Sequence, residues 1–186
     1  MRGMVRKQHK SNGWLTVFLG TENRPFPALV DRLARPALPA PAKLLPPPAS
    51  SEAVRKSMMG NKRSNTKPEL LVRQRLRAAG LTGYRLQWKV PGHPDVAWPG
   101  KKVALFVNGC FWHRCPRCKP SMPKRNVEYW VVKFERNVER DERSQAALEA
   151  LGWKVHVVWE CQLKKKAIDA TMAELLPLLA EELGKE

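Results

Sequence analysis

The four cysteines constrain the fold of this chain more than any other feature. Cys110, Cys115 and Cys118 lie within nine residues, and Cys161 follows a separate apolar segment. Four thiolates in two groups suit a tetrahedral Zn²⁺ that ties two adjacent strand ends together. A redox-active C-x-x-C pair and unliganded buried thiols are the alternatives, and a disulfide is disfavoured because the N-terminus lacks a secretory signal. The sequence therefore favours a closed, structural zinc site.

Hydrophobic patterning predicts a mixed α/β layer in which helices flank a small sheet. Thr66-Lys67-Pro68-Glu69 has the pattern of a capping box at a helix start. The nearly continuous apolar run 102–107 is typical of a central strand. Pro177 should kink or break the last helix. The order is a helix, three strands, a loop with cysteines, a long helix, a strand and a helix, over residues 66–80, 84–90, 95–98, 102–107, 127–151, 153–159 and 167–183.

Charge indicates a polyanionic partner. The formal net charge is +17, and residues 57–143 alone carry 19 basic and 7 acidic side chains. Such clustering is typical of nucleic-acid binding. No apolar run is long enough to cross a membrane, so we expect a cytoplasmic, nucleoid-associated protein. Residues 1–54 are basic and rich in proline, which predicts a flexible extension before a domain over 55–186.

Four polar side chains are candidates for chemistry. Asp95 begins a short strand after a turn, where a carboxylate could hold Mg²⁺ together with an oxygen from the end of strand 103–107. Taken alone, it is better explained as part of an ordinary Pro-Asp turn. His113 has a suitable side chain for proton transfer near neutral pH, and a zinc ligand or an exposed side chain are the alternatives. Asp141 ends the inward stripe of the long helix and needs a partner, either a neighbouring arginine or an imidazolium. Glu69 taken alone is best explained by helix capping.

Three aromatic side chains lie in or near the basic loop. Phe111 and Trp112 are adjacent, and Trp130 begins the stripe of the long helix with Val127. Bulky rings in a basic segment suit stacking on bases or wedging into a duplex. Trp130 could equally pack on the sheet.

These motifs together resemble the very-short-patch repair (Vsr) family of DNA mismatch endonucleases. The resemblance covers about residues 55–165. It is carried by joined motifs in the family's order: Thr66-Lys67-Pro68-Glu69, Gly92-His93-Pro94-Asp95, Phe106-Val107-Asn108-Gly109-Cys110-Phe111-Trp112-His113, Asn137-Val138-Glu139-Arg140-Asp141, Gly152-Trp153 and Val158-Trp159-Glu160-Cys161.

The resemblance implies a restriction-endonuclease-like core that nicks one DNA strand 5′ to the thymine of a T:G mismatch. It implies that Asp95 and the carbonyl of Val107 bind Mg²⁺, and that Zn²⁺ is structural. The catalytic set it implies is Glu69, Asn108, His113 and Asp141 beside Asp95. The wedging residues it implies are Met58, Phe111, Trp112 and Trp130. Double-stranded DNA with a T:G mismatch is the expected partner of a monomer, and other mismatch-repair proteins are candidate partners.

Two positions depart from the family pattern. Asn108 stands where a second active-site histidine is usual, and an amide cannot accept a proton. Cys115 stands where a zinc-binding histidine is usual. Two other functions therefore stay open: a restriction or defence endonuclease of the same fold, and a non-catalytic, zinc-stabilised DNA-binding module.

Overall fold

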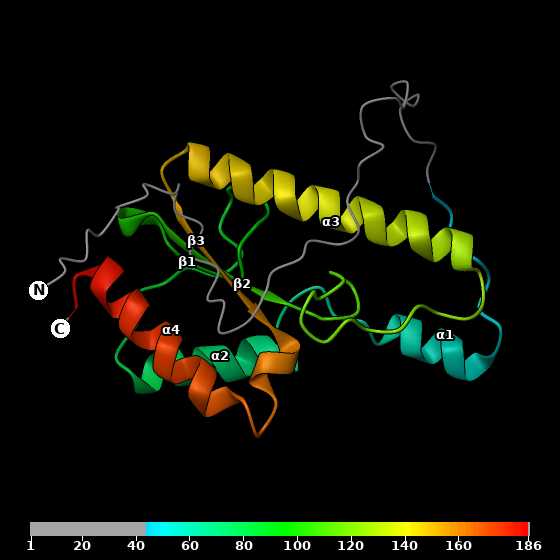
Figure 1. Ribbon diagram of the computed structural model, residues 1–186, viewed down its shortest axis with the longest axis horizontal. Coiled ribbons are helices and arrows are strands. Elements are labelled where there is room, and N and C mark those ends of the chain that lie inside the picture. The colour runs from blue at the N-terminus through cyan, green and yellow to red at the C-terminus, as the bar shows by residue number, and fades with distance from the viewer. Residues whose placement is uncertain (1–43, 186) are drawn as a thin grey trace, which may run out of the picture.

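A computed structural model of the chain describes residues 44–185. A three-stranded sheet lies at its centre, with α3 over one face and α2 and α4 over the other, while α1 stands apart (Figure 1). This confirms the expected mixed α/β class. The elements are α1 (Glu52–Met59), α2 (Lys67–Ala78), β1 (Val96–Trp98), β2 (Val103–Asn108), α3 (Val127–Ala150), β3 (Lys154–Trp159) and α4 (Ile168–Leu183). The predicted extension over 1–54 lies largely outside the described residues, so the proposed domain division stays a prediction.

The sheet is mixed because its two connections differ in length. A short turn joins β1 to β2, which pair antiparallel with Val96 opposite Leu105. The long α3 segment joins β2 to β3, which pair in parallel with Leu105 opposite His156. A parallel pair requires such a crossover, whereas an antiparallel pair does not. Five of the six residues of β2 are buried, as its apolar run predicts for a central strand.

The strand predicted over 84–90 is wrong. Only Arg85 forms a bridge there, opposite Ala97, and no strand of the described residues includes the segment. Gln87 has φ +47°, a left-handed conformation that breaks the extended backbone. Leu86 and Trp88 are consequently exposed, at 44% and 38% of their surface, rather than packed on the sheet.

The helices follow their local signals with two exceptions. The capping box at α2 is present, because Thr66 Oγ1 accepts the Glu69 N–H and the Glu69 carboxylate accepts the Thr66 N–H. The helix α4 continues through Pro177 and is not broken there. The sequence analysis did not identify α1, which has no buried residue and so carries no core-facing stripe. No helix within residues 44–185 has the length and apolarity needed to span a membrane.

The hydrophobic core lies between the sheet and the pair α2 and α4. It contains alternate residues of β2, whose side chains share one face because the strand period is two. The opposite face of β2, with Phe106, lies against α3: a Cβ added at Gly92 would be 3.1 Å from the Phe106 ring and 2.9 Å from Ser144 on α3. The core members are Val72, Leu76, Leu81, Val96, Trp98, Val103, Leu105, Val107, Val158, Leu163, Ile168, Met172, Leu175, Leu179 and Leu183.

We predict that Gly92→Ala destabilises the fold and that Gly100→Ala does not. Gly92 has φ +77° and its missing Cβ would meet Ser144 and Phe106, whereas nothing lies within 4 Å of a Cβ at Gly100. The free energy of unfolding should fall by about 2 kcal/mol for Gly92→Ala. It should change by about 0.5 kcal/mol or less for Gly100→Ala. Urea denaturation measures both, and equal effects would contradict the close packing of the turn before Asp95.

Candidate functional site

The four cysteines meet at the ends of β2 and β3. Their Sγ atoms all lie within 4.8 Å of one another, and the Cys115 and Cys161 sulfurs are 3.8 Å apart. The Cys161 N–H also donates to Cys110 Sγ at 3.2 Å. This gathering was predicted from adjacency of the two strands, and the parallel register that places Asn108 opposite Trp159 produces it.

The cysteine cluster has the donor set of a metal site. All four residues are free thiols, and Cys110 and Cys115 are buried. Burial raises the pKa of the Cys110 thiol well above its usual range and that of Cys115 to about 11. At Cys118 burial also opposes ionisation, but hydrogen bonds from the other three cysteines lower its pKa. A cation that displaces the thiol protons would satisfy all four sulfurs, and sulfur donors in this number fit Zn²⁺.

Asp95 is held by neutral donors on both carboxylate oxygens. The Val107 N–H donates to Oδ2 at 2.7 Å, and Gln87 Nε2 donates to Oδ1 at 2.9 Å. Burial raises the pKa of Asp95 to about 6; the nearby Glu69 charge also raises it, while the Val107 and Gln87 hydrogen bonds and the His113 charge lower it. Both hydrogen-bond donors are neutral, so neither supplies a counter-charge to the Asp95 carboxylate.

The carbonyl of Val107 points to the same side of β2 as its N–H group, which is the side on which Asp95 lies. A strand residue directs its N–H and C=O to one neighbour, and the Val107 N–H points at Asp95. The β1 strand begins only at Val96, so this carbonyl lies beyond the antiparallel ladder. A carboxylate and a backbone carbonyl at one edge are oxygen ligands that could hold Mg²⁺ with several waters.

Glu69 performs the capping role that the sequence analysis favoured. Its Oε2 accepts the Asn65 N–H at 2.8 Å, and its Oε1 accepts the Thr66 hydroxyl at 2.7 Å. The side chain is buried, and its charge reaches Asp95. Glu69 therefore borders the site electrostatically, although both of its oxygens are occupied by the cap.

His113 pairs with Asp141 across 28 residues of sequence, as the inward position of Asp141 suggested. His113 Nδ1 is hydrogen-bonded to Asp141 Oδ2, and Arg140 donates to the other carboxylate oxygen at 3.3 Å. A carboxylate only accepts, so Nδ1 carries the proton and Nε2 of a neutral ring keeps its lone pair. Both partners considered for Asp141, an arginine and an imidazole, are present together.

Asn108 is the last residue of β2 and is buried. Strand alternation places its side chain on the sheet face of Phe106, which is the face that α3 covers. Asp141 lies on α3, so Asn108 and the His113 and Asp141 pair share one side of the sheet. Its role in chemistry stays a prediction.

Phe111, Trp112 and Trp130 form one half-buried aromatic cluster with Phe134. Phe111 lies edge-on to Trp112 at 5.1 Å and to Trp130 at 5.5 Å, and Trp130 stacks on Phe134 at 5.4 Å between ring centroids. Trp130 packs on the buried Phe134 ring and also keeps part of its surface exposed. Packing in the fold and contact with DNA are therefore compatible roles for it. Met58 lies on α1 and is 45% exposed.

Three contributors to the site were missed from the sequence. Gln87 bonds Asp95 from a segment that alternates like a strand, which concealed it. Asn137 Nδ2 donates to the Trp112 carbonyl at 2.9 Å, and the Arg114 guanidinium lies 4.7 Å from the centre of the Phe134 ring. Asn137 is buried on α3. A polar residue within an apolar helix stripe was the feature of the sequence that could have indicated its role.

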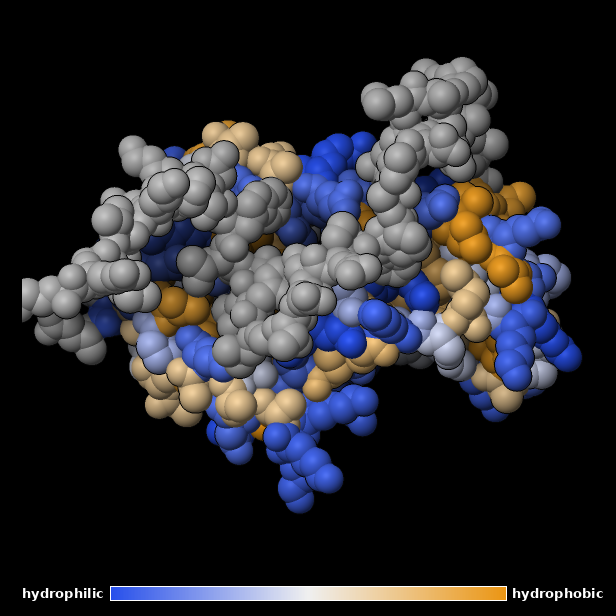
Figure 2. Space-filling view, in the orientation of Figure 1, coloured by the Kyte–Doolittle hydropathy of each residue, from blue (hydrophilic) through white to orange (hydrophobic). Residues whose placement is uncertain are grey.

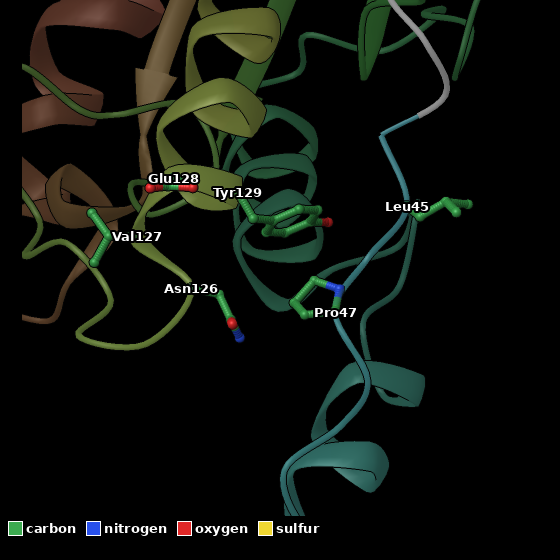
Figure 3. Close-up of a pocket in the computed structure, with 6 residues that line it drawn as sticks. All are labelled: Leu45, Pro47, Asn126, Val127, Glu128 and Tyr129. Carbon is green, nitrogen blue, oxygen red and sulfur yellow. The ribbon is translucent and has the colours of Figure 1, made fainter.

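The candidate site lies apart from a pocket near the start of α3. A pocket of about 370 Å³ lies elsewhere, between the segment after residue 43 and the start of α3, and none of the candidate site residues lines it (Figure 3). At the end of the molecule that carries α1, hydrophobic patches lie among hydrophilic ones on the face seen in Figure 2. The residues lining the pocket are Leu45, Pro47, Asn126, Val127, Glu128 and Tyr129.

Comparison with known proteins gives consistent matches. A family model described as DNA mismatch endonuclease Vsr matches residues 50–119. The chain is 41% identical over 129 residues to the type II nicking enzyme V.XorIIP of Xanthomonas oryzae, covering 68% of this chain and 94% of that protein. It is 42% identical to the type II nicking enzyme V.NmeAIP of Neisseria meningitidis serogroup A, covering 55% and 74%. It is 36% identical to the DNA mismatch endonuclease Vsr of Escherichia coli K12, covering 62% and 78%.

We predict that the purified protein carries about one equivalent of zinc held by the four thiols. The thiols should react slowly with a thiol reagent until a zinc chelator is added, and Cys118→Ser should lower both zinc retention and Tm. Exposed Ser121→Ala is the matched control. Immediate reaction of four thiols without zinc would indicate unliganded cysteines, and fewer than four titratable thiols would indicate oxidation.

We predict that Asp95→Asn stabilises the protein at pH 8 without added Mg²⁺. The pKa of Asp95 is raised from 3.8 to about 6, so the native state binds this proton more tightly than the unfolded state. Stability from this group falls as pH rises from about 4 to 6, and the full cost applies above that window. Removing the charge should gain on the order of 1 kcal/mol at pH 8 and nothing near pH 4.

Thermal or urea unfolding at the two pH values measures the effect of Asp95→Asn. Asp169→Asn is the contrasting control, because the Asp169 side chain is 78% exposed and pairs with Arg75 at 2.8 Å, so loss of its charge should not stabilise the protein at pH 8. A variant at Asp95 that is equally stable or less stable at pH 8 would show that burial does not oppose its ionisation.

Proposed function

Because the chain belongs to the Vsr family of DNA endonucleases, we propose that it nicks one strand of duplex DNA 5′ to the thymine of a T:G mismatch. The reaction is Mg²⁺-dependent hydrolysis of a phosphodiester, on a restriction-endonuclease-like core with structural Zn²⁺ at the cysteine cluster. The protein acts as a monomer on double-stranded DNA. Family membership and the similarity to an E. coli enzyme of that name support the proposal.

The observation that carries the proposal is the hydrogen bond from the Val107 N–H to Asp95. It fixes a charged carboxylate and directs a backbone carbonyl to the same edge, which is the ligand set a loosely held Mg²⁺ requires. When bound there, Mg²⁺ would stabilise charge developing on the phosphate and lower the pKa of a bound water. Asp95 and the Val107 carbonyl would hold it.

His113 is the proposed proton acceptor. Its Nδ1 donates to Asp141, which fixes the ring tautomer and leaves Nε2 able to take a proton from water. Asp141 also stabilises the imidazolium that results. Glu69 caps the N-terminus of α2 near Asp95, and we propose that its negative charge adds to that of Asp95 in the site.

Asn108 takes the place of a second histidine in this mechanism. Its amide can donate to a phosphate oxygen and accept from water, but it cannot remove a proton. The proton transfer therefore depends on His113 alone.

The aromatic cluster is the proposed wedge. Phe111, Trp112 and Trp130 would unstack the duplex, which costs least at a mismatch, and Met58 on α1 would add to them. Basic side chains at 114–125 and 133–143 would contact phosphates and give binding without reading sequence.

A nicking assay tests the proposed function. The zinc-loaded protein with Mg²⁺ is incubated with end-labelled duplexes that differ only in T:G or C:G at one position. We expect a single nick 5′ to the mispaired thymine, and loss of cleavage by about 100-fold or more in Asp95→Ala. Asp169→Ala, an exposed carboxylate on α4, should cleave like the wild type.

The same assay separates the other two functions. Equal cleavage of both duplexes would replace mismatch repair with a restriction or defence nuclease of the same family. Retention of the duplex without cleavage, unchanged in Asp95→Ala, would indicate a zinc-stabilised DNA-binding module and would contradict the proposed activity.

A further inference from the structure

Gln87 contacts the proposed metal carboxylate from a loop that the sheet does not include. Its Nε2 donates to Asp95 Oδ1 at 2.9 Å, and the Val107 N–H donates to Asp95 Oδ2. A carboxylate accepts only, so the NH₂ end of the amide must face Asp95 and the carbonyl end, Oε1, is directed elsewhere. Each Asp95 oxygen keeps a further lone pair for another partner.

The backbone at Gln87 is strained, and its surroundings hold the strain in place. Gln87 has φ +47°, a conformation that residues other than glycine, asparagine and aspartate rarely adopt. The loop is fixed on one side by Arg85, which exchanges hydrogen bonds of 2.7 and 2.9 Å with Ala97. On the other side the Val90 N–H donates to the Trp88 carbonyl at 2.8 Å.

The register of the Arg85 bridge brings Gln87 opposite Asp95. Arg85 pairs antiparallel with Ala97, so two residues further along each segment Gln87 faces Asp95. The ladder does not continue through the left-handed Gln87, yet its amide still reaches the Asp95 carboxylate at 2.9 Å. The neighbouring Leu86 and Trp88 side chains are exposed.

The chemistry of the donor also suits a metal carboxylate. An amide N–H is neutral, so it orients the carboxylate without cancelling the charge that attracts a cation. A lysine or arginine at the same place would compete with the metal. Outer partners of ligating carboxylates act in this way and their loss weakens metal binding.

We propose that Gln87 is a positioning residue that holds the Asp95 carboxylate in the orientation that binds the divalent cation. The proposal rests on the proposed function, since it takes Asp95 as the metal ligand. Gln87 acts through Asp95 and does not itself contact the scissile phosphate.

Two variants separate the amide from the backbone. Gln87→Leu keeps the size of the side chain and removes the donor. Gln87→Gly also removes the donor but relieves the left-handed strain, so its Tm should equal or exceed that of the wild type. Gln74→Leu, at an exposed position on α2, is the matched control for the change in chemistry.

Mn²⁺ binding to the zinc-loaded protein, measured by electron paramagnetic resonance of the free ion, gives a readout that does not depend on activity. The wild type should bind a Mn²⁺ that Asp95→Ala does not bind. Both Gln87 variants should bind it about 10-fold more weakly, and Gln74→Leu should bind it like the wild type. In nicking assays the Gln87 variants should need more Mg²⁺ for half-maximal kcat, with an unchanged KM for DNA.

The outcomes distinguish the two levels of the proposal. Wild-type Mn²⁺ affinity and kcat in a folded Gln87→Gly or Gln87→Leu protein would overturn the role of Gln87 while leaving Asp95 as the ligand. Equal Mn²⁺ binding by the wild type and Asp95→Ala would overturn the metal site itself, and the role of Gln87 with it. A higher Tm in Gln87→Gly together with weaker Mn²⁺ binding would show that the amide, not the loop fold, supports the site.

Discussion

The parallel pairing of β2 with β3 is the constraint on which the rest of the structure depends. It brings the segments after two distant strands to one edge, so that Cys110 and Cys161 meet although 51 residues separate them. The crossover that this pairing requires is α3, and the same helix carries Asp141 to His113. One backbone register therefore assembles both the cysteine cluster and the hydrogen-bonded pair of His113 and Asp141. The cluster in turn closes the loop that contains His113.

Two opposing effects act on the ionised form of Asp95: burial disfavours it, and hydrogen bonds from neutral groups stabilise it. Burial raises the pKa of Asp95, while two neutral donors lower it without supplying a counter-charge. A salt bridge would be the ordinary way to stabilise a partly buried carboxylate, but it would also occupy the position that a cation needs. Gln87 supplies one of these neutral donors, although its backbone is left-handed. The buried Asp95 carboxylate lowers the stability of the fold, but its charge stays available to bind a cation.

Much of the fold follows from short-range signals in the sequence. The apolar run of β2, the capping box at Thr66 and the cysteine spacing each report a local requirement, and each matches the structure. The failure at 84–90 has a physical cause: alternation of side chains records which residues are apolar, but it does not record φ, and one left-handed residue ends a strand. The position of Asp141 showed that it needed a partner, yet only the three-dimensional arrangement supplies both His113 and Arg140. The roles proposed for these residues in cleavage rest on family resemblance and local chemistry, with which the fold is compatible.

The arrangement of the aromatic rings bears on the proposed contact with DNA. Phe111 contacts Trp112, Trp130 and Phe134 edge-on, so the outer rings rest on a buried ring of α3 and would lose little side-chain freedom on meeting DNA. Side-chain ordering is a cost of association, and a pre-ordered cluster avoids most of it. The Asn137 amide holds the Trp112 carbonyl, which fixes the backbone between the rings and His113. Phe111, Trp112 and His113 are consecutive in the chain. If the rings insert at a weak base step as proposed, their insertion would therefore also set the distance between His113 and the phosphate.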